Sequence, residues 1–185
     1  MVYILLGQGF EAIEALAAAN VLRRGEADVK LVGIGGMTVA SSHHIQVVAD
    51  IAVEDVKLSA GDMVVIPGGL GGVASVEGSE CAMALVRQAA ADDTMWLCAI
   101  CAAPTLLARA GLIGEGDHAV CYPGMENEMT AVGVTAHMDQ PAVVDGKLIT
   151  GRAPGAAYDF ALKLLEAVKG RDVAERVRGD MHYPD

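Results

Sequence analysis

Residues 95–107 read MWLCAICAAPTLL, and this stretch decides the fold because it describes a buried strand that runs directly into a helix. Residues 96–100 are apolar and uncharged, as expected for a strand buried on both faces of a parallel sheet. Helix-forming residues follow from Ala102, with Pro104 in the first turn, where proline is tolerated. Cys101 therefore lies on the sharp turn at the carboxyl end of the strand, which predicts a nucleophile elbow with cysteine as the nucleophile.

The elbow position also predicts a reactive thiol. Free backbone N–H groups at the helix start, together with the helix dipole, favour an anion beside them. We therefore expect the Cys101 pKa to fall below that of an ordinary thiol.

Length and composition indicate one globular domain spanning residues 1–185. Hydrophobic residues make up 53% of the chain, which excludes disorder, and no apolar run is long enough to cross a bilayer. The apolar N-terminus lacks the basic region of a signal peptide and is expected to form a first strand in a soluble, cytoplasmic protein. The net charge of −11 argues against binding to nucleic acid or to anionic membranes.

The four cysteines do not indicate a disulfide framework, because no secretory signal accompanies them. Cys98 and Cys101 form a C-x-x-C pattern, but Cys98 falls inside the predicted strand and no second pair completes a zinc site. We expect no metal and no cofactor. Cys81 and Cys121 are expected to pack as small apolar groups.

Strand-like and helix-like segments alternate along the chain, which predicts a mostly parallel sheet with helices on its faces. The expected strands are 2–6, 29–34, 62–66, 96–100 and 118–121, with a hairpin formed by 142–144 and 147–150 and a side hairpin near 47–48. The expected helices are 11–24, 79–91, 102–111 and 156–168, followed by a short helix opening at Asp172.

Three loops follow strands whose carboxyl ends should share one edge of the sheet, where ligands bind in open α/β folds. They are residues 7–14, residues 67–72 and the Cys101 elbow. The first loop resembles a dinucleotide fingerprint, but Ala12 stands at its third glycine and the following strand ends without an acidic residue. Nucleotide binding is therefore not expected.

Glu14 and Gly69 each allow two interpretations. Glu14, in a first helical turn, either interacts with the helix dipole at the surface or stays protonated and donates a hydrogen bond to the Cys101 thiolate. Gly69 either makes a tight turn or offers its N–H to an oxyanion. No histidine stands in a clear catalytic relation to Cys101, as a cysteine protease would need.

Four motifs together give the chain a family resemblance. They are GFEAIE at 9–14, VIPGG at 65–69, AICAAP at 99–104 and TGRAPG at 150–155. In this order and spacing they resemble the ThiJ/PfpI superfamily over nearly the whole chain. The resemblance implies a flavodoxin-like three-layer sandwich, usually homodimeric. It also implies a reactive Cys101 thiolate hydrogen-bonded by Glu14, with the amides of Gly69 and Ala102 as the oxyanion hole.

Departures from the family pattern refine the expected function. The peptidase branch has a histidine where this chain has Ala102, which disfavours peptidase activity, and the chain resembles the bacterial ThiJ-like branch more than the PfpI peptidase branch. Tyr122 replaces a histidine before Pro123, and His43 replaces an anion-lining arginine of the side hairpin, whereas Arg24 is retained. Arg24, His43 and Tyr122 are therefore the candidate substrate-binding residues.

The resemblance implies a cofactor-independent glyoxalase III or deglycase that acts on methylglyoxal, glyoxal or their adducts on amines. The partners would be a small 2-oxoaldehyde or a glycated amine. The alternative is a redox sensor or holding chaperone in which Cys101 is oxidised to a sulfinate without turnover. A purely structural binding module does not account for a cysteine at an elbow beside a carboxylate.

Overall fold

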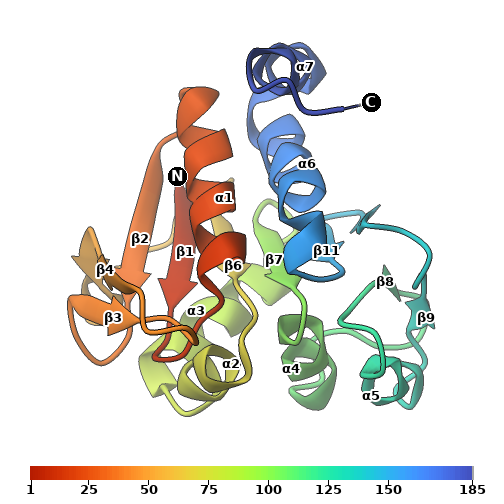
Figure 1. The fold of residues 1–185 in the computed structure, drawn as a ribbon. Coiled ribbons are helices and arrows are strands. Elements are labelled where there is room, and N and C mark those ends of the chain that lie inside the picture. The colour runs from red at the N-terminus through yellow and green to blue at the C-terminus, as the bar shows by residue number, and fades with distance from the viewer. Residues whose placement is uncertain (185) are drawn as a thin grey trace.

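The computed structural model describes residues 1–184 and confirms an α/β sandwich around a seven-stranded, mostly parallel sheet (Figure 1). The strand order is β10-β11-β7-β6-β1-β2-β5. All neighbours pair in parallel except β10 with β11, which form the antiparallel hairpin expected around Asp145 and Gly146. The strands are β1 Val2–Leu6, β2 Val29–Gly33, β5 Ile51–Ala52, β6 Met63–Ile66, β7 Trp96–Ile100, β10 Ala142–Asp145 and β11 Leu148–Gly151.

Helices cover both faces of the sheet and bury two separate cores. Leu5 packs in one core while its neighbours Ile4 and Leu6 pack in the other, because successive side chains of a strand point to opposite faces. The core on one side involves α2 Leu70–Glu77, α3 Glu80–Ala91 and α4 Ala103–Arg109. The core on the other side involves α1 Ala12–Arg24, α6 Ala157–Lys169 and α7 Arg171–Asp180.

Local sequence signals explain where these helices begin and end. The Glu11 side chain caps α1 by accepting from the N–H of Ile13, and Ser79 caps α3 by accepting from Ala82. Gly25 follows α1, and a Cβ there would meet the Leu165 side chain, so the missing side chain lets α1 pack closely on α6. Pro104 occupies the first turn of α4, as expected.

Several short elements were not predicted. They are α2, α5 Glu126–Thr130, the edge strand β5, β9 Thr135–Ala136, and the 3-10 turns Val53–Asp55 and Pro154–Ala156. The side hairpin consists of β3 Thr38–Ala40 and β4 Gln46–Val48, which pair antiparallel. The helix α2 reads LGGVASVE, and its glycines suggest a loop, but burial of Val73 and Val76 stabilises the helix.

Two further expectations were wrong. A strand over 118–121 in the main sheet does not form, because only β8 His118–Ala119 is extended and it pairs with β9 in a separate two-stranded sheet. Cys81 is not packed in the core but exposed, since it lies on the outer side of the first turn of α3. No helix within the described part of the chain is long and apolar enough to span a membrane.

Candidate active site

Cys101 occupies the turn between β7 and α4 with a left-handed backbone, at φ +66°. Such a conformation costs a non-glycine residue about 1–3 kcal/mol, so the surrounding structure must hold it in place. Its N–H donates to the Gly151 carbonyl at 2.9 Å, and its own carbonyl accepts from the Tyr122 N–H at 2.8 Å. The predicted elbow is therefore confirmed, and hydrogen bonds on both sides fix its shape.

Two helix starts converge on the Cys101 sulfur. The backbone N–H groups of Gly69 and Ala102 are hydrogen-bonded to it. Gly69 is the N-cap of α2 and Ala102 is the N-cap of α4, so both N–H groups belong to the unpaired donors of a helix terminus. Gly69 has φ +82°, a conformation that glycine adopts without penalty.

Glu14 lies beside the thiol and is only 1% exposed. Its Oε2 accepts from the Gly68 N–H at 2.6 Å, and the Cys101 thiol donates to the carboxylate. Its Oε1 is buried without a hydrogen-bond partner within the described residues. The surface interpretation of Glu14 is therefore excluded, and one carboxyl oxygen is left without a partner.

The pKa values of both Cys101 and Glu14 are raised, so neither group ionises easily in this site. Burial raises the pKa of Glu14 from 4.5 to about 7, although the Gly68 N–H and the Cys101 thiol act in the opposite direction. Burial and then the adjacent Glu14 carboxylate raise the pKa of Cys101 to about 12, against the lowering effect of the Ala102 and Gly69 amides. The expected fall in the Cys101 pKa was therefore wrong, because burial and the neighbouring charge outweigh the helix N–H groups.

Burial is the main reason that both pKa values rise, and the Glu14 carboxylate raises the pKa of Cys101 further. Titration then belongs to the pair rather than to either residue, and near neutral pH the pair holds at most one charge. The amides of Gly69 and Ala102 favour that charge on sulfur, whereas the amide of Gly68 favours it on the carboxylate.

A pocket of about 610 Å³ opens above the thiol. Its wall is mainly apolar, and Glu11 is the one lining residue with a formally charged side chain. Glu11 is held by the Ser42 hydroxyl, which donates to its Oε2 at 3.0 Å. The lining residues are Glu11, Gly69, Leu70, Cys101, Ala102, Tyr122, Pro123, Gly124, Met125 and Pro154.

The three candidate substrate-binding residues lie in different places. Tyr122 lines the pocket and is 46% exposed. His43 lies in the turn of the β3–β4 hairpin, next to the residue that bonds Glu11, but does not line the pocket. Arg24 ends α1, ten residues beyond Glu14 and roughly 15 Å along the helix axis, where it donates to Asn20 Oδ1. A single chain therefore does not bring Arg24 to the Cys101 pocket.

Sequence reasoning missed two features of the site. The Gly68-Gly69 run was expected either to make a tight turn or to offer an N–H to an oxyanion, but the Gly68 N–H anchors Glu14 instead. Met125 lines the pocket from a segment that was not expected to contribute to it, whereas Leu70 belongs to the 67–72 loop expected at this edge. The Pro67-Gly68-Gly69 run was the available signal for the first, because consecutive glycines allow close backbone approach.

The other cysteines lie apart from this chemistry. Cys98 is fully buried in β7, and its pKa is raised well above the ordinary value by burial. Cys121 is buried as expected, and burial raises its pKa to about 12. Over residues 1–184 no group of three or more His, Cys, Asp or Glu side chains is arranged to hold a metal ion.

The DJ-1/PfpI family model matches residues 1–167. Protein dj-1beta of Drosophila melanogaster is 38% identical over 176 residues, covering 94% of this chain and 92% of that protein. A Caenorhabditis elegans relative named glutathione-independent glyoxalase DJR-1.2 is 32% identical over 160 residues, covering 86% of this chain and 83% of the relative. The chain spans only 38% and 45% of the length of two Arabidopsis thaliana DJ-1 homologs, B and A.

Solved structures agree with the sequence relatives. The crystal structure of Drosophila melanogaster DJ-1beta superposes with a TM-score of 0.91 at 34% identity, covering 100% of this chain and 98% of the other. A DJ-1 superfamily protein from Salmonella typhimurium superposes with a TM-score of 0.90 at 32% identity and the same coverage. The motifs, the fold and these likenesses agree, and the chain belongs to the DJ-1/PfpI family.

Proposed function

We propose that this chain is a cysteine-dependent, cofactor-independent glyoxalase III or deglycase that acts on methylglyoxal, glyoxal or their amine adducts. The observation that supports this function best is the buried Cys101 and Glu14 pair, with the Gly69 and Ala102 amides at the sulfur, on the floor of a mainly apolar pocket. The name of the Caenorhabditis elegans relative supports the same chemistry.

The first step joins the substrate to sulfur. With the single negative charge on Cys101, the thiolate adds to the aldehyde carbon and forms a C–S bond. The aldehyde oxygen becomes an oxyanion, which the Gly69 and Ala102 amides are placed to stabilise. The Glu14 proton then neutralises this oxygen and leaves a hemithioacetal, with the carboxylate as the available base.

The next steps move a proton between the two carbons. The Glu14 carboxylate removes the hydrogen of the former aldehyde carbon as a proton, and the electron pair forms an enediolate. Glu14 returns the proton to the neighbouring carbon, and the hydroxyl proton moves to the neighbouring oxygen, which gives a thioester of a 2-hydroxy acid. Water hydrolyses the thioester, releases lactate or glycolate and restores the thiol. Overall, the dicarbonyl and one water give the 2-hydroxy acid. No net oxidation occurs, so the reaction needs no redox cofactor.

The deglycase version differs only in the first step. In a hemiaminal adduct the carbon that sulfur attacks carries a hydroxyl and the amine nitrogen. The C–S bond forms as the C–N bond breaks, the amine leaves with the Glu14 proton, and the same hemithioacetal results. Glu11 at the pocket rim suits such an adduct, because its carboxylate can accept a hydrogen bond from an amine N–H.

The test is methylglyoxal turnover without glutathione or any added cofactor. Cys101→Ser should abolish lactate formation, whereas the control Cys81→Ser should keep it, since Cys81 is exposed on α3 away from the pocket. Equal activity of the Cys101→Ser variant and the wild type would refute the proposal.

A redox role is the second candidate, favoured by the partnerless Oε1 of Glu14. A protonated Oε1 could donate to an oxygen of a Cys101 sulfinate formed by peroxide. This role predicts oxidation-dependent chaperone activity in a protein that does not consume methylglyoxal. Measuring both activities on the same sample separates the two functions.

We also propose that the chain forms a homodimer through α1 and the β3–β4 hairpin. Large apolar side chains are exposed there, with Ile13 at 56%, Ile45 at 52% and Val48 at 69%. Ile13, Leu16 and Asn20 follow one stripe of α1 that continues to Arg24. Antiparallel pairing of two α1 helices would bring Arg24 of one copy toward the Glu14 end of the other. Leu16→Asp should give monomers in size-exclusion chromatography with light scattering.

A further inference from the structure

Two histidines meet on the small β8–β9 sheet, apart from the Cys101 pocket. Nδ1 of His118 lies 2.7 Å from Nε2 of His137, and the ring centroids are 5.0 Å apart. His118 begins β8 and His137 directly follows β9. The His137 N–H donates to the Ala119 carbonyl at 2.8 Å, so backbone pairing holds the two residues on adjacent segments.

The main chain of His118 is fixed on its other side as well. Its N–H donates to Asp145 Oδ2 at 2.8 Å, and Asp145 ends β10 in the main sheet. Backbone hydrogen bonds to strand residues therefore fix the positions of both histidines.

The distance between the two nitrogens is close to the separation that a shared metal ion requires. An ion bound by imidazole at about 2.0–2.1 Å, with its ligands side by side, holds them roughly 3 Å apart. The present 2.7 Å separation is bridged by one shared proton. Each neutral imidazole carries one N–H. When the ring that donates the shared proton takes its other tautomer, the lone pairs of both facing nitrogens become available, and neither ring changes its charge.

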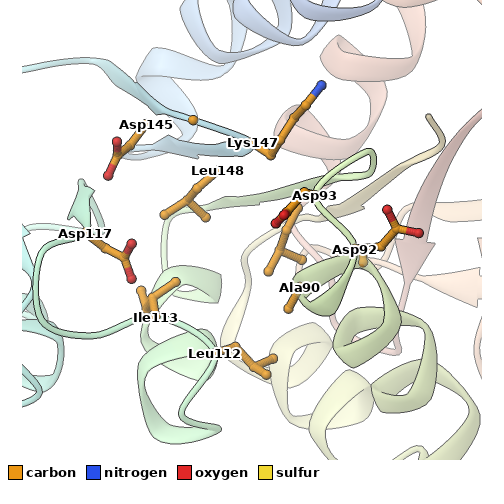
Figure 2. A pocket seen from close by; sticks show the side chains of 12 residues that line it. Ala90, Asp92, Asp93, Leu112, Ile113, Asp117, Asp145, Lys147 and Leu148 are labelled. Atoms are coloured by element: carbon orange, nitrogen blue, oxygen red, sulfur yellow. The ribbon is translucent and has the colours of Figure 1, made fainter. Parts of the chain in front are cut away.

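The surroundings are negative, which favours a cation. Asp117 directly precedes His118, and the Asp145 carboxylate accepts a hydrogen bond from the His118 N–H. Figure 2 shows both carboxylates on the same side of a neighbouring pocket. The chain as a whole has a net charge of −11. His118 is exposed and His137 partly exposed, so an ion can reach the pair from solvent.

We propose that His118 and His137 form a two-histidine site for a divalent transition-metal ion, with Cu(II) the tightest ligand and Zn(II) the next. Imidazole nitrogen is a preferred ligand of both ions, and Cu(II) stands highest in the Irving–Williams order. Within residues 1–184 no third protein ligand completes the site, so water fills the remaining positions. The site is independent of Cys101 and of the proposed reaction.

The experiment is a Cu(II) titration followed by calorimetry and electron paramagnetic resonance, in a Cys81→Ser, Cys101→Ser background that removes the exposed thiol and the thiol that lines the pocket. One ion should bind per chain, with two equatorial nitrogens in the spectrum. His118→Gln and His137→Gln should each weaken binding at least tenfold, and the double variant should bind no tighter than free imidazole. Zn(II) should compete, and Mg(II) should not.

His44→Asn is the matched control, because His44 is also exposed, lies on the β3–β4 hairpin rather than on the β8–β9 sheet, and has φ +62°, which asparagine tolerates. It should bind Cu(II) like the parent. Circular dichroism of each metal-free variant checks that it folds, since both rings lie at the surface. Parent-like binding by His118→Gln and His137→Gln, or loss of binding in His44→Asn, would overturn the site. If the parent binds no copper, the pair is only a hydrogen bond and the proposal is wrong.

Discussion

Gly68 and Cys101 lie so close that only glycine fits at position 68. A Cβ on Gly68 would come within 2.6 Å of the Cys101 Cβ and within 2.6 Å of Glu14 Oε2. The same residue donates its N–H to that oxygen. One residue without a side chain therefore sets the spacing of the proposed nucleophile and its proton carrier.

Gly68→Ala should separate Cys101 from Glu14 and reduce methylglyoxal turnover by roughly 100-fold, the loss typical of a displacement of about 1 Å at a reacting group. The measurement is kcat/KM with a melting curve beside it. Gly179→Ala is the control, because a Cβ at Gly179 in α7 meets nothing within 4 Å. That variant should keep full activity and be at least as stable as wild type. Wild-type turnover by Gly68→Ala would contradict the assigned spacing.

Glu14 should make the protein less stable as the pH rises. Its pKa in the fold is about 7 against an ordinary 4.5, so the folded chain binds this proton more tightly than the unfolded chain does. Stability therefore falls between about pH 4.5 and 7, and above that range the ionised, buried group costs about 3 kcal/mol.

Glu14→Gln should remove this dependence, because the amide cannot ionise while its oxygen can still accept from Gly68. Denaturant unfolding at pH 5 and pH 8 should show the variant gaining stability over wild type only at the higher pH. Glu175→Gln, which changes an exposed carboxylate on α7, should show no such difference. An equal gain at both pH values would mean that Glu14 is not protonated in the fold.

Cysteine labelling should reveal which partner holds the single charge. If Glu14 keeps the proton, the thiolate at Cys101 reacts first with a small alkylating reagent near neutral pH, and exposed Cys81 follows. Cys98 and Cys121 should stay unlabelled until the chain unfolds, since both are buried. Peptide mass spectrometry over time gives the order. Labelling of Cys81 well before Cys101 would place the charge on Glu14 in the resting protein.

The sequence predicted the elbow better than the pocket, and the reason is physical. β7, the turn and α4 are contiguous, so an uncharged run followed by helix formers is enough to place Cys101. Leu70 and Met125 reach the pocket through tertiary packing: α2 contains two glycines, and α5 has only five residues. Helices that short have little intrinsic stability, so no local pattern marks them.

The same limit explains the wrong pKa expectation for Cys101. The helix start is visible in the sequence, but the depth of burial and the distance to Glu14 are not, and these two determine the direction of the shift. Arg24 was expected to bind substrate because it matches a family position. That match does not show that Arg24 lies at the end of α1 far from the pocket.

The two roles of Glu14, proton donor to the thiolate and proton carrier between carbons, can be separated by two substitutions. Glu14→Gln keeps a hydrogen-bond donor beside Cys101 but cannot exchange a proton. It should retain most of the Cys101 alkylation rate while glyoxal turnover falls by 100-fold or more, within the range typical of a lost general acid–base group. Glu14→Leu removes the donor as well and should lose both.

The pH dependence of Cys101 alkylation, measured beside steady-state rates, distinguishes the outcomes. Wild-type turnover by Glu14→Gln would exclude Glu14 as the proton carrier. An unchanged thiol titration in Glu14→Leu would show that the carboxyl group does not control Cys101, and the proton would then have to come from water in the pocket.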